Sequence, residues 1–250
     1  MNKISVVVIA KNEEKNIKDC LNSVGWADQK IVVIDSSSED KTENIARKFA
    51  DSVYVRMWEG YGGQKNFGIE KAKNEWIFNL DADERVSSEL SYEIQTTLKE
   101  SPEVDGYYIP FKNYIGNRWL KHGGLYPDYH LRLFRKRCGV FEGRYGGKVH
   151  EQVHLKKVGY LKGSVEHYTY KNLGDYLAKV RKYATLEAED SIAKKDVLKW
   201  KETIKPVLRF LKIYFFQRGF LDGWFGFINA LMLSYYLTYK LYKIKKIKQK

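Results

Sequence analysis

The stretch Trp76–Arg85 constrains the fold of this chain more than any other. Its first five residues, Trp-Ile-Phe-Asn-Leu, are almost all apolar, which is typical of a strand buried in a sheet. The strand continues directly into the triplet Asp81-Ala-Asp83. Unpaired carboxylates are costly to bury, and aspartates two apart on an extended backbone point to the same side. Either both aspartates approach one hard cation at the end of the strand, or they simply begin a turn.

Strands and helices alternate along the chain up to this stretch. Residues 4–10 and 31–34 are nearly continuous apolar runs rich in β-branched residues, and 53–55 is a shorter run of the same kind. A third helix is expected to open at Gln64, after a flexible loop at Gly60–Gly63. This order predicts an α/β fold with a doubly wound, mostly parallel sheet and helices on both faces.

The pattern changes after the triplet. A helix is predicted at 88–98, and strands are predicted at 106–111, 130–134 and 165–168, in a Gly-rich and aromatic region. Helical periodicity returns around 173–184 and again in the apolar and aromatic segment that begins near residue 204.

The chain of 250 residues carries a net charge of +13, so an anionic partner is expected: nucleic acid, nucleotide phosphates or an acidic membrane face. Two cysteines are too few for a disulfide framework, which favours a reducing compartment. The apolar run near the N-terminus stops at Lys11 without a small-residue cleavage site, so we expect a strand there rather than a signal peptide.

Polar residues follow several of the predicted strands. Asn12 and Glu13 follow the first strand, Asp35 follows the second, and the Asp-Ala-Asp triplet follows the fourth. The carboxyl ends of parallel strands converge on one crevice, which is the usual ligand site of such sheets. Lys65 and a divalent ion would neutralise phosphate there. Because the chain has neither a dinucleotide fingerprint nor a P-loop, the pattern favours a nucleotide diphosphate that leaves over a resident cofactor.

The motifs taken together resemble family 2 glycosyltransferases with the GT-A fold. The chain is most similar to the branch that contains bacterial lipopolysaccharide core β-glucosyltransferases, and the resemblance covers essentially the whole chain. Each motif is weak alone, but their order is specific. The segments that carry the resemblance are Val6–Glu13, Val33–Asp40, Gln64-Lys65-Asn66, Leu80–Glu84, Pro127–Arg135, Val149-His150-Glu151 and Gly219–Gly223.

The resemblance implies inverting transfer of a hexose, with glucose from UDP-glucose as the expected donor, to a lipid-linked glycan or lipopolysaccharide core acceptor. It implies Mg²⁺ or Mn²⁺ as cofactor, bound by Asp83. His167 is either a further metal ligand or a hydrogen-bonded structural residue. The implied substrate-binding residues are Ala10, Asn12, Glu13 and Asp35 around the base and ribose, and Lys65 and Asp81 around the ribose and diphosphate.

Inversion also needs a carboxylate that takes the proton of the acceptor hydroxyl. Asp128 and Glu151 are the candidates, and the resemblance favours Glu151, although His150-Glu151 departs from the commoner Glu-Asp form of that motif. A surface ion pair is the alternative for Glu151. Arg132 and Arg135 either bind a diphosphate or acceptor phosphate, or form a solvated strand end.

The C-terminal segment has no charged residue from Gly223 to Tyr239, which is short of the ~20 apolar residues of a spanning helix. A helix over Gly219–Leu241 that lies in the membrane interface is therefore predicted, followed by six lysines between 240 and 250. The alternative is a helix that joins copies of the chain in a homo-oligomer. We predict a catalytic domain at 1–170 and a helical region for membrane association or oligomerisation at 171–250.

These features place the protein at the cytoplasmic face of the inner membrane, against an anionic surface. Two other functions predict different features. A polyprenyl-phosphate glycosyltransferase would have longer spanning helices. A nucleic-acid-binding protein would explain the charge and the aromatic residues, but the lysines are densest at the C-terminus and the chain contains no recognisable nucleic-acid module.

Overall fold

The computed structural model describes residues 2–138, 155–170, 172–193 and 203–248. The chain packs as two compact units. Unit 1 consists of Met1–Phe111 and Asp128–His167, and unit 2 consists of Lys112–Pro127 and Tyr168–Lys250. The division into domains at 1–170 and 171–250 stays a prediction.

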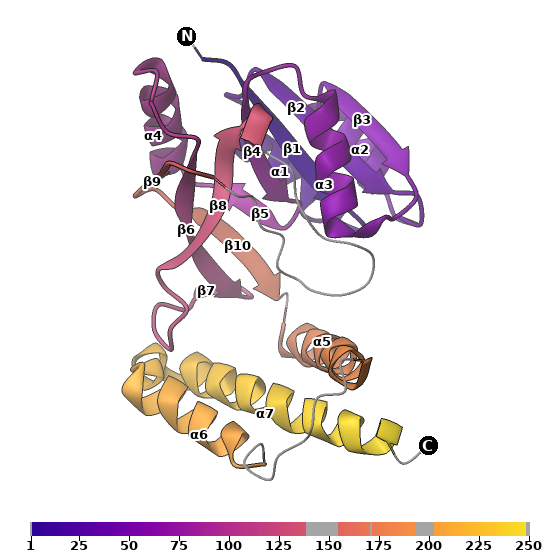
Figure 1. Cartoon of the computed structure of the whole chain (residues 1–250), viewed down its shortest axis with the longest axis vertical. Coiled ribbons are helices and arrows are strands. Elements are labelled where there is room, and N and C mark those ends of the chain that lie inside the picture. Colours follow the sequence, from indigo (N-terminus) through magenta and orange to yellow (C-terminus); the bar gives the residue numbers. More distant parts are fainter. Residues whose placement is uncertain (1, 139–154, 171, 194–202, 249–250) are drawn as a thin grey trace. The chain divides into compact units, whose positions relative to one another are not determined.

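Unit 1 begins with the predicted alternation of strands and helices (Figure 1). The four strands are parallel and lie in the order β3-β2-β1-β4. The elements are β1 Ile4–Ala10, α1 Ile17–Ser23, β2 Gln29–Asp35, α2 Thr42–Phe49, β3 Ser52–Arg56, α3 Gly60–Lys71 and β4 Trp76–Asp81. Helix α3 starts at Gly60 rather than at Gln64, so the predicted Gly60–Gly63 loop is wrong and Lys65 lies inside the helix.

Beyond β4 the sheet continues with antiparallel neighbours, in the order β4-β8-β6-β10-β5. The short strands β7 and β9 both pair with β6. Strands β6 and β10 each contribute residues to both units. The elements are β5 Glu84–Val86, α4 Ser88–Lys99, β6 Gly106–Ile115, β7 Arg118–Trp119, β8 Asp128–Arg135, the 3-10 turn Lys136–Cys138, β9 Val158–Tyr160 and β10 Val165–Tyr170.

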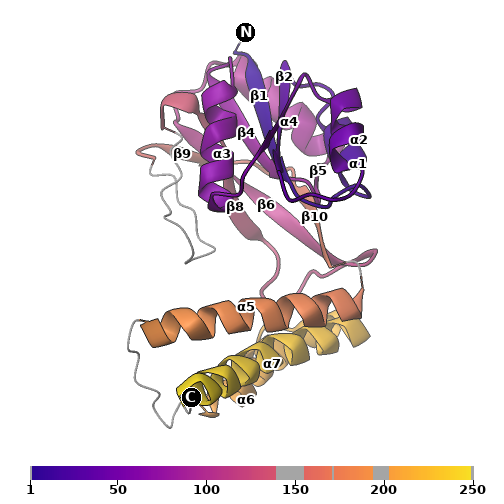
Figure 2. The same cartoon turned by 90° about the vertical axis from the view of Figure 1, so that its right-hand side faces the viewer.

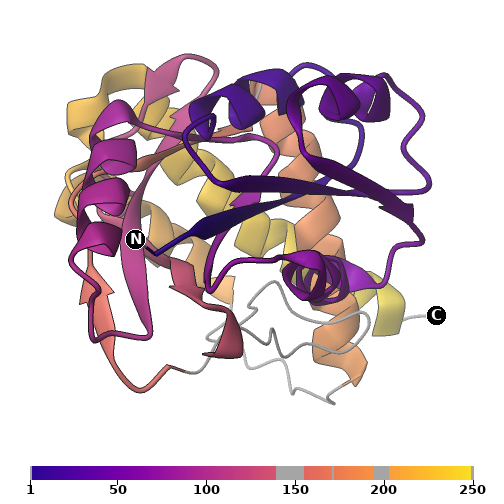
Figure 3. The same cartoon turned by 90° about the horizontal axis from the view of Figure 1, so that it is seen from above.

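The sheet of unit 1 has a hydrophobic core on each face. Successive side chains of β4 point alternately into the two cores. Trp76, Phe78 and Leu80 point into the core that α1, α2 and α4 cover. Ile77 points into the opposite core, which α3 covers. The expected mixed α/β fold with helices on both faces is thus confirmed (Figures 2 and 3). Because side chains alternate along a strand, Asn79 and Asp81 share the α3 face with Ile77.

Unit 2 is built from helices. Helix α7 packs against both α5 and α6. The elements are α5 Leu173–Ala193, α6 Lys205–Leu211, the π-helical turn η3 Lys212–Phe216, the 3-10 turn η4 Gly219–Asp222 and α7 Gly223–Lys248. Among the residues described, none of these helices is long and apolar enough to cross a membrane. The helix predicted over Gly219–Leu241 is instead a 3-10 turn followed by α7, which extends to Lys248.

Candidate functional site

The carboxyl ends of three parallel strands in unit 1 meet at one edge. Ala10 at the end of β1 pairs with Ile34 of β2, and Ile9 pairs with Asp81 of β4. Asp35 is the last residue of β2. The polar residues predicted at this edge therefore lie on neighbouring strands, as the sequence indicated.

Asp35 is a fixed anion at this edge, with only 2% of its surface exposed. Its carboxylate pairs with Lys11, whose Nζ lies 2.9 Å from Oδ2, and Oδ1 accepts a hydrogen bond of 2.9 Å from the Ser37 N–H. Burial alone would raise the pKa of Asp35, but the hydrogen bonds from Ser37 and Lys11 hold it below its usual value. Lys11 and Ser37 were not predicted as members of the site.

Asn12 lies in the exposed loop after β1 with φ at +54°, in the left-handed region. Its N–H donates to Ser38 Oγ at 2.9 Å, and its side-chain Oδ1 accepts from the Glu39 N–H at 2.8 Å. Thus Asn12 ties the loop after β1 to the loop after β2. Through these contacts Asn12 shapes the edge of the sheet where the strands end.

A second tie involves Asp40, which the sequence analysis did not assign to the site. Its Oδ2 accepts from the Glu14 N–H at 2.9 Å, and its Oδ1 accepts from the Thr42 N–H at 2.9 Å. Thr42 Oγ1 in turn accepts from the Glu13 N–H at 2.7 Å. Burial would raise the pKa of Asp40, but these hydrogen bonds lower it. The backbone N–H of Glu13 is therefore held against Thr42, the first residue of α2.

Asp81 is the centre of a cluster of charges on the α3 face. Lys65 Nζ lies 3.5 Å from its Oδ1, and Arg132 Nη2 lies 3.2 Å from its Oδ2. The Lys65 and Arg132 side chains are only 7% and 11% exposed. Burial would raise the pKa of Asp81, but the charges of Lys65, Arg132 and His167 hold it far below its usual value. Asp81 is thus ionised and held in place by two cations.

Glu84 completes this cluster, although the sequence analysis gave it no role. The side chain is fully buried, and its carboxylate accepts hydrogen bonds from the Arg132 guanidinium and, at 2.9 Å, from the Asp81 N–H. Burial raises the pKa of Glu84, opposed by the charge of Arg132. Its position directly after the Asp-Ala-Asp triplet is the sequence signal that could have identified it.

Asp83 and His167 lie side by side at the same edge. Antiparallel pairing of β5 with β10 sets His167 opposite Glu84, and its Nε2 lies 3.6 Å from Asp83 Oδ2. Both side chains are partly exposed, at 20% for Asp83 and 24% for His167. Burial would lower the pKa of His167, but the Asp83 carboxylate outweighs it and raises the pKa.

The Asp83–His167 pair bears on the predicted divalent ion. Within the described ranges, no group of three or more His, Cys, Asp or Glu residues is arranged to hold a metal. A magnesium-type ion on a nucleotide needs only one or two protein ligands, because phosphates and water complete its coordination. A carboxylate and an imidazole at the open end of the strands fit that requirement.

The candidate base Asp128 begins β8, the strand that also carries His130 and Arg132, and the register of β8 against β6 shifts between Leu131 and Leu133. Its Oδ2 lies 2.9 Å from His130 Nε2. The Phe111 ring lies 4.6 Å from the His130 ring and 5.0 Å from the Arg132 guanidinium. Asp128 is therefore linked to the charge cluster through His130 and the Phe111 ring, which Arg132 also contacts. The other candidate, Glu151, lies outside the described residues.

Arg135 is not brought to this group. Strand β8 runs antiparallel to β4, so Arg135 pairs with Trp76, at the opposite end of β4 from Asp81. Its guanidinium pairs with Glu75 and donates to the carbonyl oxygens of Pro102 at 2.8 Å and Val104 at 3.2 Å. The register of β8 thus separates the two arginines and gives Arg135 a structural role.

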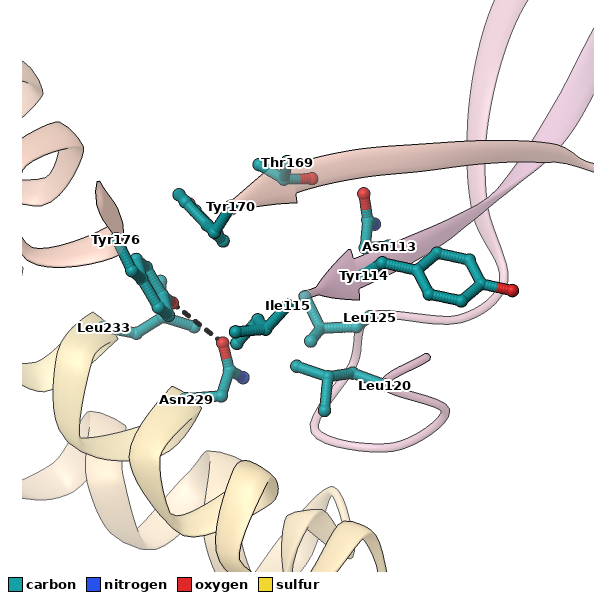
Figure 4. Close-up of a pocket in the computed structure, with 10 residues that line it drawn as sticks. All are labelled: Asn113, Tyr114, Ile115, Leu120, Leu125, Thr169, Tyr170, Tyr176, Asn229 and Leu233. Atoms are coloured by element: carbon teal, nitrogen blue, oxygen red, sulfur yellow. Dashed lines mark hydrogen bonds between the residues drawn. The ribbon is translucent and has the colours of Figure 1, made fainter. Parts of the chain in front are cut away.

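A separate cavity of about 150 Å³ lies within unit 2 (Figure 4). Its lining is mostly apolar, and the Tyr176 hydroxyl donates a 2.9 Å hydrogen bond to Asn229 Oδ1 at its side. None of the predicted site residues lines this cavity.

The sequence model of Glycosyl transferase family 2 matches residues 5–148. The chain is 30% identical over 241 residues to the lipopolysaccharide core biosynthesis glycosyltransferase LpsC of Rhizobium meliloti, covering 93% of this chain and 88% of that protein. It is 28% identical over 260 residues to an uncharacterized glycosyltransferase of Rickettsia typhi, covering 100% of this chain and 89% of the relative. The crystal structure of S. aureus TarS 1-349 in complex with UDP-GlcNAc has the same fold, with a TM-score of 0.53 and 17% identity over 99% of this chain and 92% of that one.

Proposed function

The chain belongs to glycosyltransferase family 2, and we propose that it is a metal-dependent, inverting hexosyltransferase that uses a UDP-hexose and modifies a lipopolysaccharide core or another lipid-linked glycan. The charge cluster around Asp81 at the carboxyl edge of the sheet carries this proposal. The role of LpsC in lipopolysaccharide core biosynthesis supports the acceptor, and the UDP-GlcNAc bound by TarS, a protein of the same fold, supports the donor class. UDP-glucose is the donor that we expect.

The donor would lie along the strand ends. Asn12, Asp35 and the Glu13 backbone form the side of the crevice for the base and ribose. Lys65 and Arg132 are the cations nearest Asp81, where a diphosphate would meet positive charge in a largely water-excluded setting. Both cations are held by Asp81, so they are oriented before the donor arrives.

Asp83 and His167 would hold the divalent ion, Mg²⁺ or Mn²⁺. When bound, the ion supplies Lewis-acid stabilisation of the negative charge on the departing diphosphate. The pairing of β5 with β10 holds His167 beside Asp83, and Arg132 anchors Glu84 between them and Asp81.

Donor binding is the first test of this proposal. A panel of nucleotide sugars is screened by thermal shift and by hydrolysis, with Mn²⁺ and with EDTA. We expect a UDP-hexose to stabilise the protein only with metal, and Asp83→Asn to lose turnover by at least ~10²-fold. The control is Asp51→Asn, an exposed aspartate that precedes β3 at the other edge of the sheet. Near-normal turnover of Asp83→Asn at saturating metal contradicts the metal role.

The base is tested with Glu151→Gln and Asp128→Asn. The variant that lacks the base should lose ~10²–10⁴-fold in kcat while it keeps its affinity for the donor, because the lost interaction matters only as the acceptor hydroxyl ionises. We expect this for Glu151→Gln. The same pattern in Asp128→Asn, with an active Glu151→Gln, assigns the role to Asp128 and its partner His130.

A further inference from the structure

Unit 2 exposes an unusual amount of large apolar surface between residues 204 and 224. Phe216 is 84% exposed and Trp224 is 65% exposed. Val207, Leu208, Phe215 and Phe220 are also exposed. Together these six side chains are called the aromatic edge. Contiguous apolar patches are uncommon on soluble proteins, and a large one marks a surface that meets a partner.

The spacing of the residues in α6 and η3 explains why they form one stripe. Val207, Leu211 and Phe215 recur every four residues and are all exposed, whereas Pro206 and Ile213 on the other side are buried in unit 2. The segment formed by α6 and η3 is therefore apolar on its buried side and on its exposed side. Only the buried side packs against α7.

Ring contacts join this stripe to the corner that precedes α7. Tyr214 lies 6.3 Å from Phe220 and 5.8 Å from Phe227, and Trp224 stacks on Phe227 at 5.5 Å. The left-handed backbone of Arg218, at φ +57°, turns the chain between η3 and η4. The exposed rings of Phe220 and Trp224 are thus fixed by half-buried neighbours.

The charges around the aromatic edge are almost all positive. Lys205 and Lys212 are exposed beside the apolar stripe, whereas Arg209 is half-buried and its charge acts on Glu187 of α5. Between residues 203 and 248 the sequence has nine Lys or Arg and a single acidic residue, Asp222. Asp222 is buried and pairs with His122 at 2.9 Å, so it does not offset the positive surface.

We propose that the aromatic edge docks on an anionic lipid bilayer, with Phe216 and Trp224 inserted among the headgroups and Lys205 and Lys212 at the lipid phosphates. Exposed aromatic side chains flanked by a basic stripe are the signature of an interfacial segment. A second copy of the chain fits less well, because two such surfaces would bring like charges together.

This assignment keeps only Phe220 and Trp224 from the segment Gly219–Leu241 expected from sequence and adds residues 207–216 that precede it. Helix α7 buries Ile228, Ala230 and Ile244 and packs against α5 and α6. Deleting that helix would therefore unfold unit 2, and point substitutions on the exposed rings are the suitable test. The inference depends on the surface of unit 2 and not on the proposed reaction.

The experiment is flotation of the full-length protein with vesicles of phosphatidylcholine alone or mixed with phosphatidylglycerol, without any sugar donor. We expect binding to the anionic vesicles, and a loss of roughly tenfold or more in the double variant Phe216→Ser/Trp224→Ser. The control is Tyr92→Ser, because Tyr92 in α4 of unit 1 is 74% exposed; it should bind like the wild type. If the double variant does not fold, Phe216→Ser alone serves.

The salt dependence of vesicle binding distinguishes the contribution of the lysines from that of the aromatic side chains. Lys205→Gln/Lys212→Gln should bind more weakly at about 0.1 M salt and differ little from the wild type at about 1 M, where charges are screened. Two results would overturn the proposal. One is wild-type protein that stays unbound to anionic vesicles at low salt. The other is undiminished flotation of Phe216→Ser/Trp224→Ser together with a change from dimer to monomer by light scattering, which assigns the edge to a contact between copies.

Discussion

The strand-end edge of unit 1 and the aromatic edge of unit 2 differ from the usual distribution of charged and apolar side chains in opposite ways. Unit 1 buries charge, since Glu84 is fully covered and Lys65 is 6% exposed. Unit 2 exposes apolar rings, with Phe216 at 84%. Buried ions and large exposed apolar patches are both the exception in soluble proteins. Each departure therefore coincides with a surface for which we propose a ligand.

The buried charges of unit 1 and the exposed rings of unit 2 differ in the interactions that they need in the folded protein. The buried charges stay in place because each has a partner of opposite sign, and removing one partner leaves a desolvated ion. The exposed rings need no such partner in the folded chain, so their removal costs folding little. Substitutions in the two regions should consequently have different effects on stability, and the following predictions test that contrast.

The largest effect is expected for Arg132→Met. It leaves the buried Glu84 without its cation and removes a partner of Asp81, which should cost ~3–5 kcal/mol of unfolding free energy. Urea unfolding measures this cost. The double variant Arg132→Met/Glu84→Gln should recover part of the loss, because it no longer buries an unpaired charge. A cost for Arg132→Met below that of an exposed arginine, such as Arg47→Met, would break the comparison.

A smaller effect is expected for Asp40→Asn, which weakens the tie between the loop after β1 and α2. We expect a loss of ~1–2 kcal/mol at neutral pH. The folded-state pKa of Asp40 is lowered from 3.8, so its stabilisation is present above that pH and is lost as the pH falls. The difference between wild type and variant should therefore shrink below about pH 4 in unfolding titrations. If the difference in unfolding free energy between wild type and Asp40→Asn stays constant across pH, the lost stability comes from packing and not from the charge of Asp40.

The smallest effect is expected for Phe216→Ser. Its side chain is 84% exposed, so the unfolding free energy should change by no more than about 0.5 kcal/mol while vesicle binding falls. Thermal and urea unfolding of unit 2 check this. A loss as large as that expected for Arg132→Met would show that the ring is part of a core, and the contrast between the two regions would then disappear.

The sequence by itself determined the α/β sheet and the edge where its polar residues meet. The apolar runs at 4–10, 31–34 and 76–80 are typical of buried parallel strands with helices between them, and the structure contains these strands. When those strands pair in parallel register, Asp35 and Asp81 lie at the same edge of the sheet, where the strands end. This inference needs no long-range contact other than the parallel register.

Tertiary structure decided which other side chains join them. His167 lies beside Asp83 because β10 pairs with β5, and Arg132 rather than Arg135 lies near Asp81 because β8 is antiparallel to β4. Nothing in the local pattern sets that order or register. The same holds for residues 112–127, which pack in unit 2, and for the aromatic edge, where the sequence shows apolar side chains but not which of them α7 covers. Burial depends on contacts between distant segments, and these exist only in the folded chain.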